Sequence, residues 1–421
     1  MSNKKDGNGM ARKRYAFVGT WEDFGGHGEG IYVFAIDPET GSMKETDHLK
    51  GYRNNSILAV SWDKKRLYAT IEDKNYQDVW GGGGGVLALS FDAERGKLAV
   101  LNEKSALGAC TSYISADPEG KCIVITNHGS GLDVVTKVVK DEQGNYKIVK
   151  EYDDSTLVMF RLLEDGALGG ASDLRKHVGR GALEVRGQVC SHLHSVNFDP
   201  SGKWILACDK GCDCIYVYRV DREKGILQAA PRTVFHTRPG TAPRHLSFHP
   251  FLPYCFVNNE TASTVTAYRF DSEEGILEEI DYQPMIDMDP STKAELVGDT
   301  YGSPADIHVH PNGKFVYSSQ RSSYHTKRGM DCIAVFAVNL ENGHLTRMAN
   351  VEMDGPCPRG FAIDPEGRFL YVGNQYLDTI CRYRIDEVTG TLTGKEVVAH
   401  VATPTCIRIV DVESKGGTYG I

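Results

Sequence analysis

Histidine, arginine and glutamate side chains suited to acid–base chemistry on an anionic compound recur at widely separated points of this sequence. Five stand out: His194 in HLHS, Arg244 in PRH, Glu260 in NNE, Arg321 in SSQR and Arg359 in PRG. A histidine and a carboxylate can transfer protons. The guanidinium group of an arginine can donate two parallel hydrogen bonds to a carboxylate or a phosphate. These residues lie in five separate segments, so the chemistry requires a fold that gathers distant parts of the chain.

A repeated unit of four strands and three turns supplies such a fold. Its clearest copy, 191–228, reads as an apolar run, an Asp-Pro-x-Gly turn, two alternating strands and a short tail. The turn and the apolar run after it recur in six copies, at 61–70, 116–126, 198–207, 248–257, 309–318 and 363–372. A regular period of this kind indicates an array of identical supersecondary units.

A seventh copy is divided between the two ends of the chain. Residues 15–43 hold only the later strands of a unit, and 403–412 hold only its first strand. A C-terminal strand that joins the N-terminal blade closes a ring and leaves no open sheet edge. We therefore expect an all-β fold, a seven-bladed β-propeller of four-stranded antiparallel blades. The predicted domain is 15–412, between an N-terminal tail, 1–14, and a C-terminal tail, 413–421.

A long insert at 132–188 interrupts the region of blade three. Its strand-like part, DVVTKVVKDEQGNYKIVKEY, predicts a hairpin that extends this blade, and a polar loop at 177–188 follows it as a candidate rim or lid. The glycine run at 81–85 precedes a strand rather than a helix, so it predicts a loop instead of a phosphate cradle.

The blade geometry places the candidate residues on one face. The first strand of a blade runs down the central channel and the second runs back, so the start of the first and the end of the second share one mouth. His194, Arg244 and Arg359 belong to first-strand starts, and Glu260 and Arg321 to second-strand ends. The same reasoning adds five candidates at this mouth: His245, Asn259, Asp306, Gln375 and, from the insert, Arg186.

The composition limits the classes of partner that this protein can bind. The net charge of −9 argues against binding of nucleic acid or an acidic membrane through the whole surface, whereas a small anion can bind a local arginine cluster. No signal peptide or membrane span is evident, so we expect a cytoplasmic protein. The eleven cysteines mostly lie in strand-like runs and are expected to be reduced, and Cys208, Cys212 and Cys214 lack the remaining pattern of a zinc site. Oligomeric state is not legible from the sequence.

The segments HSVNFDPSGK, APRHLSFHP, VNNE, PADIHVHPNGKFVYSSQR and CPRGFAIDPEGRFLYVGNQ resemble the propeller lactonase family. That family includes bacterial 6-phosphogluconolactonases and the fungal 3-carboxy-cis,cis-muconate cyclase. The resemblance runs from about Tyr15 to Val410 and is poorest in the insert. It implies seven blades, no required metal or other cofactor, and lactone chemistry that uses His194, Arg244, Glu260 and Arg321.

The expected activity is hydrolysis of a sugar-acid lactone, 6-phosphogluconolactone, by acid–base catalysis. Either His194 or Glu260 is the base, and the sequence leaves this choice open. Arg244 is the candidate for stabilising the oxyanion, and Arg321 and Arg359 for holding the anionic group of the substrate. We expect His245, Asn259, Asp306 and Gln375 to orient these groups.

Three alternatives remain beside this hypothesis. A cyclase or lactonase for a carboxylated, muconate-type compound would use the same arginines. A metal-dependent gluconolactonase would need an inward-facing ring of carboxylates. The carboxylates available for such a ring are Glu22, Asp23, Glu72, Asp73, Glu260 and Asp306. A non-catalytic scaffold would instead expose a broad apolar patch, and no contiguous one is legible in the sequence.

Overall fold

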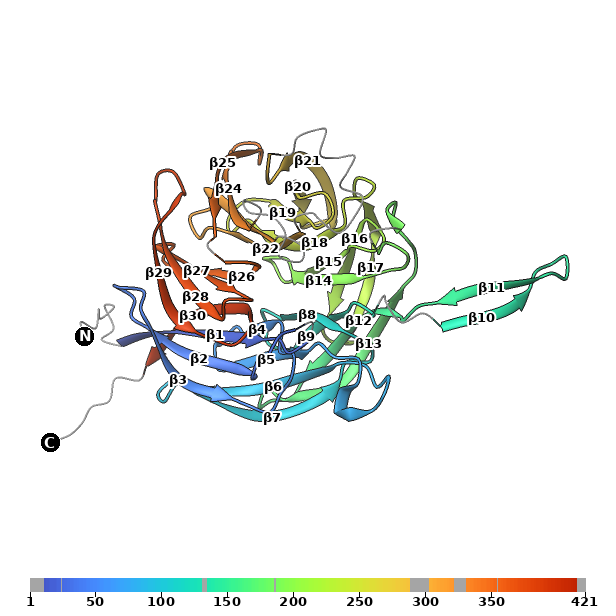
Figure 1. Ribbon diagram of the computed structural model, residues 1–421, viewed down its shortest axis with the longest axis horizontal. Coiled ribbons are helices and arrows are strands. Elements are labelled where there is room, and N and C mark those ends of the chain that lie inside the picture. The colour runs from blue at the N-terminus through green and yellow to red at the C-terminus, as the bar shows by residue number, and fades with distance from the viewer. Residues whose placement is uncertain are drawn as a thin grey trace.

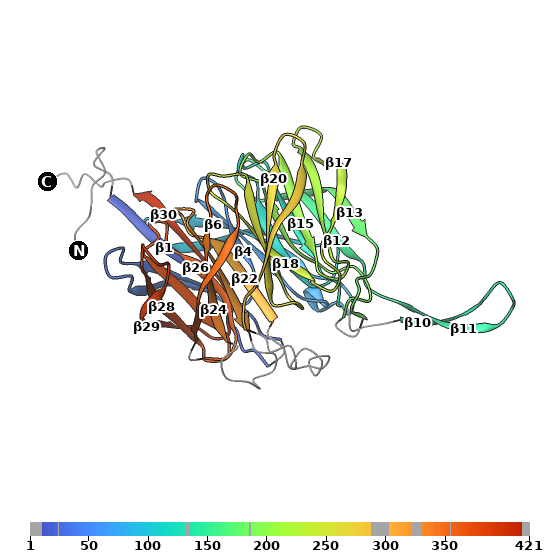
Figure 2. The ribbon, with the colours of Figure 1, turned by 90° about the horizontal axis from the view of Figure 1, so that it is seen from above.

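Seven four-stranded antiparallel sheets form a ring, as Figure 1 shows from one face and Figure 2 from the side. The computed structural model describes residues 11–23, 25–130, 135–184, 187–287, 303–321, 331–353 and 355–414. The predicted seven-bladed propeller is confirmed.

The blades are numbered here from the N-terminus. Blade 1 holds β1 (Ala11–Thr20), β2 (Ile31–Ile36), β3 (Met43–Leu49) and β30 (Pro404–Ser414). Blade 2 holds β4 (Leu58–Val60), β5 (Arg66–Ile71), β6 (Gly85–Asp92) and β7 (Lys97–Ser105). Blade 3 holds β8 (Thr111–Ala116), β9 (Cys122–Asn127), β12 (Ser155–Leu162) and β13 (Leu168–His177).

Blade 4 holds β14 (Leu193–Phe198), β15 (Trp204–Asp209), β16 (Cys214–Asp221) and β17 (Ile226–His236). Blade 5 holds β18 (Pro243–Phe248), β19 (Tyr254–Asn259), β20 (Thr264–Asp271) and β21 (Ile276–Pro284). Blade 6 holds β22 (Ser303–Val309), β23 (Phe315–Arg321), β24 (Cys332–Val338) and β25 (Leu345–Glu352). Blade 7 holds β26 (Pro358–Ile363), β27 (Phe369–Asn374), β28 (Thr379–Ile385) and β29 (Leu392–His400). A short 3₁₀-helix, η1 (Tyr76–Asp78), follows β5.

The Asp-Pro-x-Gly motif forms the tight turn between the first two strands of a blade. In blade 4, the Asp199 carboxylate accepts hydrogen bonds from the backbone N–H of Ser201 (3.1 Å) and of Trp204 (2.8 Å). Gly202 adopts a φ of 69°, a left-handed conformation that glycine reaches without steric cost. The motif therefore marks the end of each inner hairpin that lies away from the candidate residues.

Seven apolar clusters hold the ring together, and each lies between two adjacent blades. The cluster between blades 3 and 4, for example, joins Val124 and Met159 to Val196 and Ile205. Close-packed interiors of this kind resist displacement of their strands. The core thus lies between the sheets and fixes the inner strands around the channel.

Ring closure occurs by the predicted strand exchange. Strand β30 pairs antiparallel with β1 from Ala11↔Ser414 to Thr20↔Pro404. The Arg14 guanidinium donates to both Asp411 oxygens (2.7 and 3.0 Å) and to Asp364 (2.6 Å) of blade 7. The two ends of the chain are thereby tied to each other and to the neighbouring blade.

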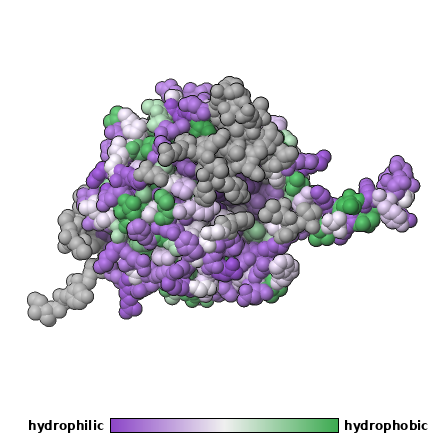
Figure 3. All heavy atoms as spheres, viewed as in Figure 1, coloured by the Kyte–Doolittle hydropathy of each residue, from purple (hydrophilic) through white to green (hydrophobic). Residues whose placement is uncertain are grey.

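The insert forms a separate two-stranded hairpin, here called the arm, of β10 (Val135–Lys140) and β11 (Tyr146–Glu151). The predicted hairpin is confirmed, but the prediction that it extends blade 3 is wrong. Strand β12 pairs directly with β9 and β13 is the outer strand of the blade, whereas β10 and β11 pair with each other in a sheet of their own. Figures 1 and 2 show the arm extending away from the ring, and Figure 3 shows apolar residues on it. All eleven cysteines are free thiols, and in the described part of the chain no helix has the length and apolar character to cross a membrane.

Candidate active site

β-Bulges bring five polar side chains to one mouth of the channel. The register between first and second strands shifts near the start of the first strand in five blades. The residues at these shifts include Ser112, His194, Arg244, Asp306 and Arg359. A bulge leaves its extra residue out of the ladder and re-aims the side chain. All five line a single pocket.

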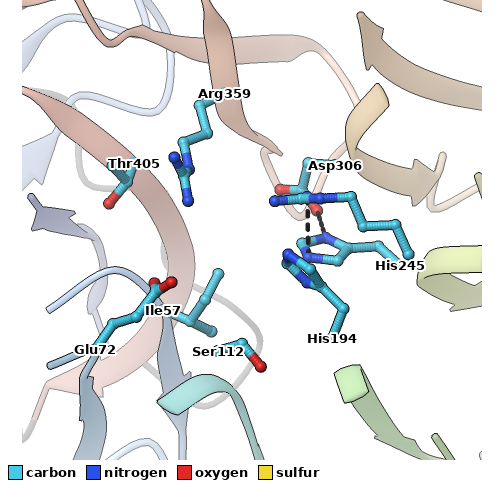
Figure 4. A pocket seen from close by; sticks show the side chains of 9 residues that line it. Ile57, Glu72, Ser112, His194, His245, Asp306, Arg359 and Thr405 are labelled. Carbon is cyan, nitrogen blue, oxygen red and sulfur yellow. Dashed lines mark hydrogen bonds and ion pairs between the residues drawn. The ribbon is translucent and has the colours of Figure 1, made fainter. Parts of the chain in front are cut away.

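This pocket draws on every blade of the ring. Its other lining residues are Ile57, Glu72, His245 and Thr405, the last from β30. The empty space of the pocket, its open mouth included, is about 280 Å³. The centre of a water molecule fits in only about 10 Å³ of this space. The deep part therefore has room for about one water, and a ligand of sugar size must lie over the mouth. Figure 4 shows Glu72 and Arg359 across the pocket from His194, His245 and Asp306.

His194 is a buried and uncharged imidazole. Burial, and then the positive charge of Arg244, lower the pKa of His194 well below its ordinary value. Its ring lies 5.2 Å from that of His245 and 5.6 Å from that of His128. Its Nδ1 atom is buried and has no hydrogen-bond partner among the residues that the structure describes. At neutral pH this side chain can accept a proton.

Glu260 follows β19 and lies between two cations. Its Oε1 accepts a hydrogen bond from Lys210 Nζ (3.1 Å), and its Oε2 lies 2.9 Å from Arg244 Nε. Burial opposes ionisation of Glu260, but the charges of Lys210, Arg244 and Arg321 outweigh it and lower its pKa. Glu260 is therefore a carboxylate at any ordinary pH, and it balances charge in a strongly positive site.

His245 and Asp306 form a second hydrogen-bonded chain. His245 Nδ1 lies 3.0 Å from Asp306 Oδ1, and His245 Nε2 lies 3.2 Å from Arg244 Nη1. Because an arginine only donates, Nε2 accepts and Nδ1 carries the proton toward Asp306. Burial and then Arg244 lower the pKa of His245 to about 3. His308 Nε2 also lies 3.0 Å from Asp306 Oδ2. This chain contacts the Arg244 guanidinium at Nη1, whereas Glu260 contacts it at Nε.

The remaining arginines extend the positive charge along the mouth. Arg359 contacts Gln375 Oε1 (3.5 Å), and its guanidinium lies 4.1 Å from the ring centre of Trp21. Burial, followed by repulsion from Arg321, lowers the pKa of Arg359. Arg321 donates to the Ser303 carbonyl (2.9 Å) and hydroxyl (2.8 Å), and it is not part of the pocket lining. An anion over this mouth would relieve the repulsion.

The structure gathers most, but not all, of the predicted site residues. His194, Arg244, His245, Asp306 and Arg359 line one pocket, and Glu260, Arg321 and Gln375 adjoin it through the contacts above. Asn259 lies in the strand pair β19–β20, where its amide donates to Thr264 (3.0 Å) and Thr266 (2.8 Å). Arg186 lies outside the described residues.

Sequence reasoning did not single out Lys210, His128 or Ser112. The sequence does hold a signal for Lys210 and His128, which is their position in the repeat. In each blade one residue at the end of the second strand, or directly after it, takes the position that Glu260 has in blade 5. These residues are Trp21, Glu72, His128, Lys210, Glu260, Arg321 and Gln375. Ser112 has no such signal, since its place depends on the bulge in β8. Among the residues that the structure describes, no three His, Cys, Asp or Glu side chains are arranged to hold a metal ion.

Known proteins resemble the chain over nearly its whole length. The model of the family "Lactonase, 7-bladed beta-propeller" matches residues 15–144 and 133–409. A 6-phosphogluconolactonase of Bacillus subtilis is 29% identical over 398 residues, which are 94% of this chain and 99% of the relative. A 6-phosphogluconolactonase of an Enterobacter species is 30% identical over 340 residues, 80% of this chain and 83% of the relative.

A solved structure from Bacteroides fragilis matches with a TM-score of 0.77 and 29% identity, covering 95% of this chain and 98% of that one. The family match includes both inner-strand segments that carry Arg244 and Arg359. On this evidence the chain belongs to the seven-bladed β-propeller lactonase family.

Proposed function

We propose that this protein hydrolyses the lactone of a phosphorylated sugar acid, with 6-phosphogluconolactone as its substrate. The observation that carries the proposal is a buried, uncharged His194 in one pocket with Arg244 and Arg359, where Glu260, adjoining the pocket, forms an ion pair with Arg244. The relatives named 6-phosphogluconolactonase support the choice of substrate.

His194 is the base in this proposal. Its lowered pKa keeps it unprotonated at neutral pH, and within the described part of the chain no group bonds to its Nδ1. Glu260 is a weaker candidate, because Lys210 and Arg244 already contact its two carboxylate oxygens. His194 therefore takes a proton from water as the water oxygen attacks the lactone carbonyl.

Arg244 stabilises the negative charge that forms on the carbonyl oxygen. Glu260 at Nε, and His245 with Asp306 at Nη1, fix its guanidinium before substrate arrives. Preorganised donors of this kind need no reorientation during the reaction. When the tetrahedral intermediate collapses, the carbonyl C–O bond to the ring oxygen breaks. The protonated His194 then returns its proton to that oxygen, so water is added and a hydroxy acid leaves.

The phosphate binds at the mouth in this proposal. Arg359 reaches the pocket with its guanidinium stacked on Trp21, and the mutual repulsion of Arg359 and Arg321 favours an incoming dianion. A carboxylated lactone would satisfy the same arginines with less charge, so the comparison of substrates decides between the two classes.

Initial rates of acid release, corrected for spontaneous opening, test the proposal on three lactones: 6-phosphogluconolactone, gluconolactone and a carboxylated muconolactone. We expect the highest kcat/KM for the phosphorylated compound. His194→Asn should lower this kcat/KM by about 10² to 10⁴, the usual contribution of a general base. The matched control is His344→Asn, since His344 is exposed in a turn of blade 6.

Wild-type protein that does not exceed the spontaneous rate on any of the three lactones would refute lactonase activity. A preference for the muconolactone would retain the site but replace the substrate. Equal loss of rate in the His194 and His344 variants would remove His194 from the chemistry.

A further inference from the structure

Glu72 is a carboxylate of the pocket that has no partner in the described part of the chain. It comes directly after β5, and its half-buried side chain lines the pocket. Among the residues that the structure describes, none donates a hydrogen bond to the Glu72 carboxylate or forms an ion pair with it. Two other carboxylates near the pocket are compensated, because Glu260 contacts two cations and Asp306 two histidines. Glu72 is therefore available to a ligand.

The Glu72 side chain faces the reacting groups across the pocket. Figure 4 shows it pointing into the pocket opposite His194, with Arg359 on its own side. Burial and the charge of Arg321 lower the pKa of Arg359, and the charge of Glu72 opposes this shift. Since one small pocket holds all of these lining side chains, a ligand over its mouth that contacts His194 and Arg359 lies beside Glu72 as well.

A carboxylate in this position favours one kind of ligand group, the neutral hydrogen-bond donor. The two oxygens of an ionised carboxylate only accept hydrogen bonds. Cationic donors are disfavoured, because Arg244 and Arg359 line the same pocket. A second anionic group of the ligand would be repelled by Glu72, and carbonyl or ether oxygens have no hydrogen to donate. In a lactone the neutral donors are hydroxyl groups, and two neighbouring hydroxyls match the two carboxylate oxygens.

We propose that Glu72 binds hydroxyl groups of the substrate and makes the site prefer polyhydroxylated lactones to carboxylated ones, an inference that rests on the lactonase function proposed above. In the bound substrate, Arg244 contacts the carbonyl oxygen, Arg359 the anionic group and Glu72 the ring hydroxyls. A muconate-type lactone brings a carboxylate and no hydroxyl to the pocket. Glu72 would then lose its hydrogen bonds to water without replacement, and an unpaired polar group of this kind disfavours binding.

Binding of stable ligands tests the role of Glu72 without turnover. Isothermal titration calorimetry on the full-length protein compares 6-phosphogluconate with inorganic phosphate, which has no carbon-bound hydroxyl. The variants are Glu72→Gln, which keeps one acceptor oxygen, and Glu72→Leu, which keeps none. We expect Glu72→Leu to weaken 6-phosphogluconate binding about 10- to 100-fold, as for loss of hydrogen bonds to a charged group, and Glu72→Gln to weaken it less. Inorganic phosphate should bind unchanged or more tightly, because a negative charge is removed.

The matched control is Glu274→Gln, since Glu274 is exposed in the turn between β20 and β21 and should change neither affinity. With 6-phosphogluconolactone as substrate, kcat/KM should fall in the same order, with Glu72→Leu below Glu72→Gln and Glu72→Gln below wild type.

Several results would overturn the role of Glu72. The hydroxyls add nothing if 6-phosphogluconate binds wild type no more tightly than inorganic phosphate does. An affinity for 6-phosphogluconate, or a kcat/KM, that is unchanged or raised in Glu72→Leu would exclude the contact. An equal loss for both ligands would place the effect at the anion site instead. Failure of the proposed function is a different result, in which wild type accelerates the opening of no lactone, and the binding comparison does not depend on it.

Discussion

Replacing Arg14 with leucine should destabilise the ring at its closure. The Arg14 side chain is only 2% exposed and neutralises Asp411 and Asp364, whose side chains are 10% and 0% exposed. Removing one partner of a buried ion pair costs about 3 to 5 kcal/mol, since a charge stays buried without compensation. Arg12, 3.6 Å from Asp411, retains part of the compensation there. We therefore expect a loss of about 3 kcal/mol, mainly from Asp364.

Denaturant unfolding followed by intrinsic fluorescence measures this loss. Arg12→Leu is the matched control on the same strand. The Arg12 side chain is 50% exposed, so its removal should cost no more than about 1 kcal/mol. The cost of Arg14→Leu should also shrink from pH 8 to pH 5. Burial already raises the pKa of Asp364, and loss of Arg14 raises it further, so protonation at lower pH relieves the folded state.

Two outcomes would refute this reasoning about closure. One is a loss for Arg14→Leu no greater than that for Arg12→Leu. The other is a destabilisation that is the same at pH 8 and pH 5, because an uncompensated carboxylate must respond to protonation. The double variant Arg14→Leu with Asp411→Leu should recover part of the loss, since it removes one of the two stranded charges.

Two further predictions concern substrate binding and pH. Arg359→Lys should raise KM for the phosphorylated lactone about tenfold with little change in kcat, because lysine loses the two-point fork and the stacking on Trp21; an equal change in KM for unphosphorylated gluconolactone would contradict this role. His177, bonded to Tyr218 (2.8 Å), has its pKa lowered to about 4 by burial and by Arg175. Between about pH 6.5 and 4 the unfolded chain therefore binds more protons than the folded chain, and the free energy of unfolding decreases as the pH is lowered through this window. Unfolding at pH 7 and pH 5 should show a loss smaller by about 2 kcal/mol in His177→Gln than in wild type, and identical losses would exclude His177 as a source of this dependence.

The architecture was predictable because it rests on periodic signals. The turn in each copy, the alternation of its strands and the divided seventh copy are all local patterns, and ring closure follows from them. The position of the arm was not predictable in the same way. Its residues alternate like any edge strand, but β12 pairs directly with β9, and that choice depends on the packing of Leu157 and Met159 into the core between blades. Periodicity carries no information on which of two following strands makes that contact.

The candidate site was predictable as a location but not in its internal contacts. Strand direction alone placed His194, Arg244 and Arg359 at one mouth. Which side chains face the pocket depends on bulges, as Ser112 shows, and a bulge leaves no mark in the residue types. Asn259 is the opposite case. Its polar side chain was expected at the mouth, but it bonds across the strand pair to Thr264 and Thr266. The ionisation of Glu260 could not be predicted from the sequence either, since it depends on Lys210. This lysine belongs to the neighbouring blade, and its Nζ lies 3.1 Å from Glu260 Oε1.

The exchanged strand also has a consequence for synthesis. Strand β1 precedes every other strand of the ring and its partner β30 follows them all, so the edge of β1 stays unpaired until all the strands between have been made. Exposed strand edges invite pairing with other chains, and charged residues on them discourage it. This edge carries Arg12, Lys13 and Arg14 in succession. Asp411 arrives with the final strand and neutralises Arg14, so the charge that protects the nascent edge becomes the bond that seals the finished ring.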